Sequence, residues 1–212
     1  MTEILSQSER VELVSPNDDV LNRVAVEVTT QEISSTETQK LIKQMLKIAQ
    51  GEQGDVNKRT MVGLASPQVG VSKRIIIVDV ATTGMGETPE LRAYINPKII
   101  RKSEQVEQGR EGCYSTGNVC GNVDRSSEVT IEAYDQDGNL VSETWTGFTA
   151  RIFQHEIDHL DGVRFPDRIT DDAKLHWVES DKFGEYRTEW ANWDIFCPRS
   201  TWDDIKSGKK PR

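Results

Sequence analysis

The chain has 212 residues, of which 35% are hydrophobic, and its formal net charge at pH 7 is −9. This length and composition predict a soluble protein with a sizeable core. The negative charge excludes a polybasic surface for nucleic acid or anionic lipid. No apolar run approaches the roughly 18 residues of a membrane span, and residues 1–13 have the pattern of neither a secretory nor a transit signal. The three cysteines lack the spacing of a disulfide framework, which predicts a reducing, cytoplasmic location.

The first predicted element is a helix over residues 41–49. Ser34 and Glu37 have the spacing of a capping box ahead of it, and Gly51 is expected to end it. Its apolar residues recur with helical spacing: Leu41, Ile42, Met45, Leu46 and Ala49. The polar residues 51–58 that follow are expected to form a loop.

Four strands are predicted after this loop from their apolar and β-branched residues. They cover residues 74–80, 92–96, 128–134 and 140–145. Asp137-Gly138, between the last two strands, is typical of a hairpin turn. A second helix follows, which begins at Thr146-Gly147 and ends by Gly162. This order predicts an α+β domain in which mixed or antiparallel β-sheets wrap around the second helix.

The chain is expected to divide into a catalytic domain of residues 1–170 and a C-terminal extension of residues 171–212. Four of the five tryptophans lie in the extension: Trp177, Trp190, Trp193 and Trp202. Disordered tails are poor in aromatic residues, so this one is expected to pack on a surface. We favour its own domain as that surface over a partner protein.

The second helix carries the pentapeptide His155-Glu156-Ile157-Asp158-His159. Side chains four residues apart lie one turn apart on the same helix face, so both imidazoles can reach one cation with Glu156 beside it. The same pattern occurs by chance on ordinary amphipathic helices, where the two histidines would bind nothing. A catalytic metal also requires a third protein ligand and an open position.

Candidates for the third ligand lie on both sides of this helix. The downstream candidates are His176, Glu179 and Glu185, and none has the short spacing of an extended zinc-binding motif. The upstream candidate is Cys113, beside Gly112, and its thiolate would be a strong, soft ligand. We therefore predict that Cys113, His155 and His159 bind a divalent metal, with water in the fourth position.

Three motifs of the chain together resemble the peptide deformylase family. They are Val62-Gly63-Leu64-Ala65-Ser66-Pro67-Gln68, the segment from Glu111 to Ser115, and the segment from Gln154 to Leu160. The resemblance covers about residues 13–169 and leaves the extension outside. The chain departs from the family's usual residues at Met61, Ser66, Tyr114 and Cys120. None of these departures removes a metal ligand or Glu156, and they bear on the exit side of the expected peptide groove.

The resemblance implies a metal-dependent hydrolase that removes the N-formyl group from N-formylmethionyl peptides of newly made proteins and releases formate. This reaction belongs to N-terminal methionine processing in protein biosynthesis. The resemblance also implies one Fe(2+) ion per chain, with Zn, Ni or Co as substitutes. We expect a monomer whose partners are nascent peptides, with transient ribosome association and no direct contact with nucleic acid or membrane.

Three residues are assigned to the chemistry. Glu156 is expected to act as general base toward the metal-bound water and then as general acid toward the departing amine. The carboxamide of Gln68 and the backbone N–H of Tyr114 would stabilise the negative charge on the substrate oxygen, if the family's arrangement carries over. Glu111 is expected to orient the site from behind the ligands. Asp158 either orients a histidine or faces water.

Four further residues are assigned to substrate binding by the resemblance. Val62, Gly63 and Leu64 should offer main-chain hydrogen bonds to an extended peptide, in the manner of an added strand. Phe153 should form part of the wall of an apolar pocket for the methionine side chain. Cys120 and Cys197 are expected to be unpaired thiols without function.

Two other functions fit the same motifs. A metallopeptidase of the His-Glu-x-x-His type would cleave unformylated peptides and be indifferent to a formyl group. A non-catalytic relative would bind formyl-Met peptides, or keep a structural metal, and release no formate.

Overall fold

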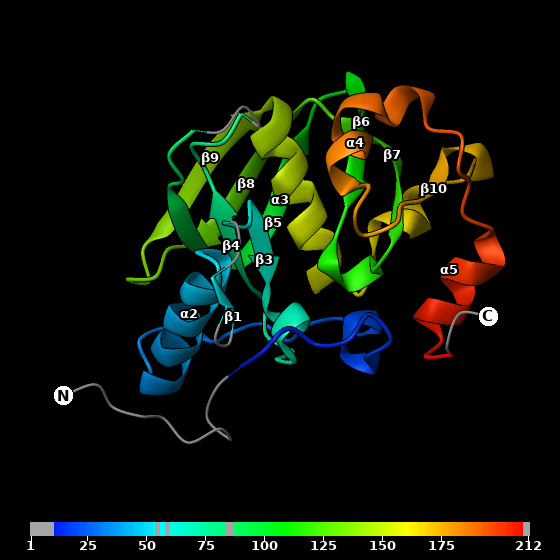
Figure 1. Ribbon diagram of the computed structural model, residues 1–212. Helices are drawn as coiled ribbons and strands as arrows, with labels where there is room; N and C mark the ends of the chain where they lie inside the picture. The colour runs from blue at the N-terminus through cyan, green and yellow to red at the C-terminus, as the bar shows by residue number, and fades with distance from the viewer. Residues whose placement is uncertain (1–10, 54–55, 58–59, 84–86, 210–212) are drawn as a thin grey trace.

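The computed structural model describes residues 11–53, 56–57, 60–83 and 87–209 (Figure 1). Within these ranges, no helix combines the length and the apolar character needed to cross a membrane. The described residues form two antiparallel sheets, one short strand pair and five α-helices, which confirms the predicted α+β class.

The larger sheet has five antiparallel strands in the order β3-β4-β5-β8-β9. Its strands are β3 (Gly63–Ala65), β4 (Ile75–Asp79), β5 (Leu91–Lys102), β8 (Glu128–Tyr134) and β9 (Leu140–Thr146). The four predicted strands are confirmed, although β5 runs on to Lys102. The three-residue β3 was not predicted, because so short a strand has no measurable periodicity.

The second sheet has three antiparallel strands in the order β10-β7-β6. They are β6 (Val106–Gly112), β7 (Val119–Ser126) and β10 (Leu175–Trp177). Sequence reasoning missed all three, because β6 has a single apolar residue and β7 is interrupted by Gly121 and Asn122. Residues 51–58 were predicted as a loop but contain the antiparallel pair β1 (Glu52–Gln53) and β2 (Val56–Asn57).

The predicted first helix is α2 (Thr36–Ala49), which follows the single turn α1 (Thr30–Ile33). The predicted capping box at Ser34 and Glu37 is wrong, because the N-cap of α2 is Ser35, which accepts a hydrogen bond from the Thr38 backbone. The capping box of this region starts α1 instead, where Thr29 and Glu32 bond reciprocally.

The buried strand β4 separates two apolar clusters, because successive side chains of a strand point to opposite faces. Ile75 and Ile77 pack with α2 on one face. Ile76 and Val78 pack with α3 (Gly147–Leu160) on the other. Figure 1 shows α3 lying between the larger sheet and strands β6 and β7, so the predicted central helix is confirmed.

The extension packs against the three-stranded sheet (Figure 1). It supplies β10, α4 (Phe183–Glu189) and α5 (Arg199–Lys206). Trp202 is 1% exposed and Tyr186 is 3% exposed, so both are part of the core. Short 3₁₀ helices complete the fold: Asp19–Asn22, Ser66–Val69, Tyr114–Thr116, Phe165–Arg168, Asp172–Lys174 and Trp190–Asn192.

Candidate metal centre

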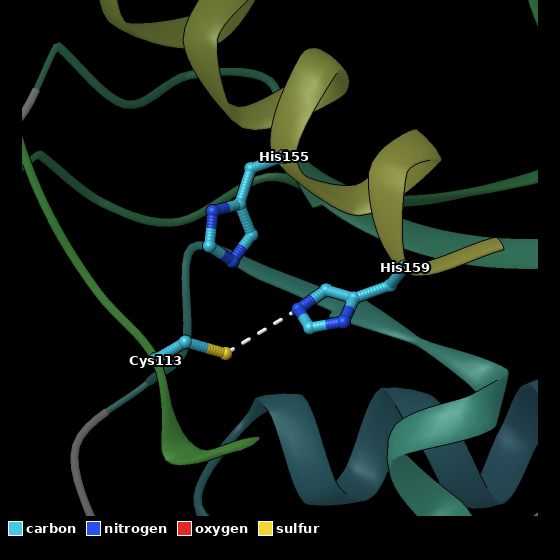
Figure 2. Close-up of side chains that lie close together, drawn as sticks. All are labelled: Cys113, His155 and His159. Carbon is cyan, nitrogen blue, oxygen red and sulfur yellow. Dashed lines mark hydrogen bonds between the residues drawn. The ribbon is translucent and has the colours of Figure 1, made fainter. Parts of the chain in front are cut away.

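Cys113, His155 and His159 converge between the two sheets. Cys113 follows directly after β6, and the two histidines lie one turn apart on α3. Their ligand atoms all lie within 4.8 Å of one another, and Figure 2 shows the sulfur directed toward the His159 ring. The Cys113 Sγ to His159 Nε2 distance is 3.4 Å.

This donor set fits a divalent metal. A thiolate at about 2.3 Å and an imidazole nitrogen at about 2.0 Å from one tetrahedral ion lie roughly 3.5 Å apart, close to the observed separation. Burial, reinforced by the nearby His155, lowers the pKa of His159 well below 6.5, so that its ring is neutral and keeps a lone pair for a ligand bond. Two nitrogens and a sulfur leave a fourth position for water or substrate.

The downstream candidates for the third ligand lie elsewhere. His176 is buried, and its Nδ1 lies 2.9 Å from the hydroxyl of Tyr186. Glu179 accepts a hydrogen bond from Trp177, and Glu185 pairs with Lys182. Their side chains thus form hydrogen bonds and an ion pair with other residues of the extension.

Glu111 orients His155 from behind. Its Oε2 lies 2.9 Å from His155 Nδ1, and Arg125 bonds both of its carboxylate oxygens at 2.9 Å. Arg151 adds a further bond at 2.9 Å. Burial alone would raise the pKa of Glu111, but hydrogen bonds from His155 and Arg125 hold it well below its ordinary value. The ionised carboxylate therefore accepts the Nδ1 proton and leaves Nε2 of His155 as the ligand atom. Burial alone would lower the pKa of His155, but hydrogen bonds with Cys113 and Glu111 raise it well above 6.5, so Nε2 must lose a proton before it can bind a metal.

Asp158 is buried against two arginines. It is 6% exposed and accepts hydrogen bonds from Arg125 at 2.5 Å and from Arg168 at 2.6 Å. Because Arg125 also holds Glu111, Asp158 is linked to His155 only through two intervening side chains. Of the two alternatives considered from the sequence, the water-facing position is wrong, and the orientation of a histidine by Asp158 stays a prediction that would act through Arg125 and Glu111.

The carboxylate of Glu156 is buried beside the ligands. Its Oε2 has no hydrogen-bond partner within the described residues, and burial raises its pKa to about 7. Strand β3 runs so close to α3 that a Cβ added at Gly63 would overlap this carboxylate. Gly63 is therefore required for this close approach.

Gln68, the last residue of the first motif, lies against the candidate ligand Cys113. Its Oε1 accepts a hydrogen bond from the backbone of Ala65 at 2.7 Å, which fixes the orientation of the amide. Its Nε2 then donates to Cys113 Sγ at 3.3 Å and to Ser115 Oγ at 3.2 Å. Tyr114 follows the cysteine, and its side chain projects outward, with 48% of the residue exposed.

The expected peptide-binding residues divide into two groups. Val62 is 39% exposed, and Gly63 and Leu64 lie in β3, which in the described part of the chain pairs with β4 alone. The other edge of β3 pairs with no described strand, although Gly63 and Leu64 are themselves buried. Phe153 lies away from any open surface, fully buried against Tyr94 and Trp145 at ring distances of 4.9 Å and 5.7 Å.

Cys120, where the family commonly has an arginine, faces the extension. It is 1% exposed and packs with Val178 and Tyr186. Burial raises its pKa to about 12, so the thiol is neutral and unreactive. The extension thus packs beside β7 at one of the four positions where the sequence departs from the family pattern.

Sequence reasoning missed three buried arginines: Arg125, Arg151 and Arg164. In a sequence, a buried arginine looks the same as an exposed one. The available signal was charge balance, because Glu111 and Asp158 beside a buried metal site need cationic partners.

Comparisons with known proteins agree with this geometry. The sequence model of the family described as polypeptide deformylase matches residues 11–175. The chain is 42% identical to a peptide deformylase of Desulforudis audaxviator over 136 residues, which cover 63% of this chain and 83% of the relative. Among solved structures, peptide deformylase from Thermotoga maritima has a TM-score of 0.64 and 33% identity, covering 76% of this chain and 99% of that one. A Met-Ala-Ser-bound class I type b peptide deformylase from Acinetobacter baumannii has a TM-score of 0.66 and 31% identity, covering 76% and 98%.

Proposed function

The chain belongs to the peptide deformylase family, and from this membership we propose how its own residues remove the N-formyl group from N-formylmethionyl peptides. The activity is a metal-dependent hydrolysis that releases formate and a free amino terminus. One observation carries the proposal: Cys113, His155 and His159 meet within 4.8 Å, with the buried carboxylate of Glu156 beside them.

Cys113, His155 and His159 would hold the metal. When bound, a divalent ion lowers the pKa of a coordinated water and polarises the substrate carbonyl. Two imidazoles and one thiolate suit several ions, so the donor set alone does not select one. We propose Fe(2+), as the family resemblance implies, with Zn, Ni and Co as substitutes.

Glu156 would move the protons of the reaction. A carboxylate with a pKa of about 7 can take a proton from water near neutral pH and return it to the leaving amine. Its Oε2, which has no hydrogen-bond partner in the described part of the chain, could accept that proton. Glu111 and Arg125 would keep His155 in the tautomer that binds metal, and they take no part in proton transfer.

Gln68 and Tyr114 would stabilise the negative charge that develops on the formyl oxygen. The amide of Gln68 is held by Ala65, so its NH₂ group needs little reorganisation to donate to the substrate. The backbone N–H of Tyr114 is the second proposed donor, and its exposed ring leaves that role unaffected.

The peptide would lie along the free edge of β3. Main-chain groups of Val62, Gly63 and Leu64 would bind it as an added strand. The narrow space between β3 and α3 favours a formyl group, which carries only hydrogen, over bulkier acyl groups. Phe153 would reach the methionine side chain only if its present packing opened. A monomer in the cytoplasm, in transient contact with the ribosome, remains part of this proposal.

The test is formate release from formyl-Met-Ala-Ser by anaerobically purified protein. We expect turnover by the native chain and a loss of about 100- to 10,000-fold in Glu156→Gln. Glu185→Gln, the same change at an exposed ion pair with Lys182, is the control and should keep the native rate. Equal rates for Glu156→Gln and the native chain would refute the mechanism. Cleavage of unformylated Met-Ala-Ser would indicate a metallopeptidase instead, and peptide binding without formate release a non-catalytic relative.

A further inference from the structure

We propose that the C-terminal extension positions the metal ligand Cys113, through a chain of contacts from Trp202 to Arg164 and on to Ser115. The inference rests on the proposed metal-binding role of Cys113. The family match ends at residue 175, so α5, which carries Trp202, lies wholly outside it. The extension would therefore add a support to the metal centre that the matched region does not contain.

Arg164 is the centre of this chain of contacts. It is 1% exposed, and its Nη1 donates to the carbonyl oxygens of Ser115 at 2.9 Å and Pro16 at 2.6 Å. Its Nη2 donates to Asn22 Oδ1 at 2.9 Å. These three acceptors are neutral oxygens. The buried charge is supported further by the nearby Asp167 carboxylate and by the ring of Trp202, whose centroid lies 4.5 Å away.

Trp202 is held in place by polar contacts as well as by packing. Its Nε1 donates to Asp167 Oδ1 at 2.9 Å, and Lys206, one turn later on α5, pairs with the same carboxylate at 2.8 Å. At the start of α5, Arg199 donates to the backbone oxygens of Pro166 and Ile169. These contacts fix α5 on the segment that follows the metal helix, and so fix the ring over Arg164.

Ser115 passes the constraint to the metal site. It is fully buried, and its Oγ accepts a hydrogen bond from Gln68 Nε2, which also donates to Cys113 Sγ. Arg164 holds the backbone of the same residue. A shift of Ser115 would therefore move both the thiolate ligand and the proposed oxyanion donor.

Cys113 also packs against an apolar cluster that the extension helps to form. The extension contributes four buried residues to this cluster: Leu175, Cys197, Trp202 and Ile205. A second cluster, around Cys120, Tyr186 and Val178, has Trp190 at its border. Trp190 is therefore a matched control, because it is a tryptophan of the same extension in a cluster that does not include Cys113.

The test uses the full chain loaded with Co(2+), whose thiolate charge-transfer absorption reports the Cys113 ligand directly. The variants are Trp202→Leu, Trp202→Phe, Arg164→Lys and the control Trp190→Leu. We expect Trp202→Leu and Arg164→Lys to lose cobalt to a chelator about 10-fold faster than the native chain, with an altered thiolate band. Lysine keeps the charge but lacks the fork that binds Ser115 and Asn22 together. Trp202→Phe, which keeps an aromatic face, should behave nearly as the native chain, as should Trp190→Leu.

Native cobalt release and an unchanged band in both Trp202→Leu and Arg164→Lys would overturn the inference. Equally fast cobalt loss from Trp190→Leu would also overturn the inference, because the effect would then be a general loosening of the extension. If circular dichroism shows that Trp202→Leu does not fold, Arg164→Lys and Trp202→Phe decide the matter. A native chain that binds cobalt without any thiolate band would instead refute the proposed metal centre itself.

Discussion

Glu156 is a carboxylate placed where folding alone would not put one. One of its oxygens has no hydrogen-bond partner among the residues described, and the side chain lies against the backbone of β3 at Gly63. Burial without a partner disfavours the charged form, which is why the pKa of Glu156 rises to about 7. A base with this pKa suits the proton transfer proposed for Glu156, and that role would come at a cost in stability.

This trade-off predicts that Glu156→Gln stabilises the metal-free protein at pH 8. The pKa of Glu156 is raised in the folded state, so its unfavourable effect is absent below its ordinary value of 4.5 and complete above about 7. Glutamine has the same shape and no charge. We expect a gain of about 3 kcal/mol at pH 8, because the pKa rises from 4.5 to about 7 and each pKa unit corresponds to about 1.4 kcal/mol, and almost none at pH 4.5. Urea unfolding of chelator-treated protein at the two pH values measures it. A variant less stable than the native chain at pH 8 would contradict the prediction.

Strand β3 can lie as close to α3 as it does only because Gly63 has no side chain. Gly63 lies in β3 opposite Glu156 of α3, and a methyl group there would occupy the space of the carboxylate. The apolar residues of α3 fix the helix on the larger sheet, so the helix cannot retreat. The carboxylate is the group that would have to move.

Gly63→Ala should therefore impair catalysis more than folding. We expect formate release to fall about 100-fold, because displacement of a reacting group by an ångström can have that effect. The control is Gly184→Ala in α4, where an added Cβ meets nothing within 4 Å and alanine favours the helix. Rates and thermal midpoints of both variants should be compared. Native turnover in Gly63→Ala would show that Glu156 can relocate without loss.

Elements with a clear pattern of apolar residues could be predicted from the sequence, whereas elements held together by polar contacts could not. The apolar residues of β4 and the helical spacing of His155 and His159 each correspond to an observed element. Strands β6 and β7 are fixed by pairing and by ion pairs such as Glu111 with Arg125, which have no periodic pattern. For the same reason, the grouping of Cys113 with the two histidines was accessible from residue types, whereas the role of Gly63 required coordinates.

On the scale of the whole molecule, the extension completes the sheet from which Cys113 emerges. Strand β10 pairs with β7, and β7 pairs with β6, which ends just before Cys113. The extension also contributes to both apolar clusters on this side of the molecule. A sheet shared between two parts of a chain joins them into one cooperative unit, because neither part can bury its apolar surface alone.

The extension should therefore unfold together with the rest of the protein. Four of the five tryptophans lie in it, and Trp145 in β9 is the fifth, so the fluorescence of a Trp145→Phe variant reports on the extension alone. We expect its fluorescence transition in urea to coincide with the loss of far-UV circular dichroism, as a two-state process requires. The native chain, followed by the same two signals, is the control for the substitution. If the fluorescence of the variant changed at a lower urea concentration than the dichroism, the extension would be a separately docked unit. In that case its contacts with Arg164 could open while the metal ligands stayed folded, and native-state hydrogen exchange should then show α5 opening before α3.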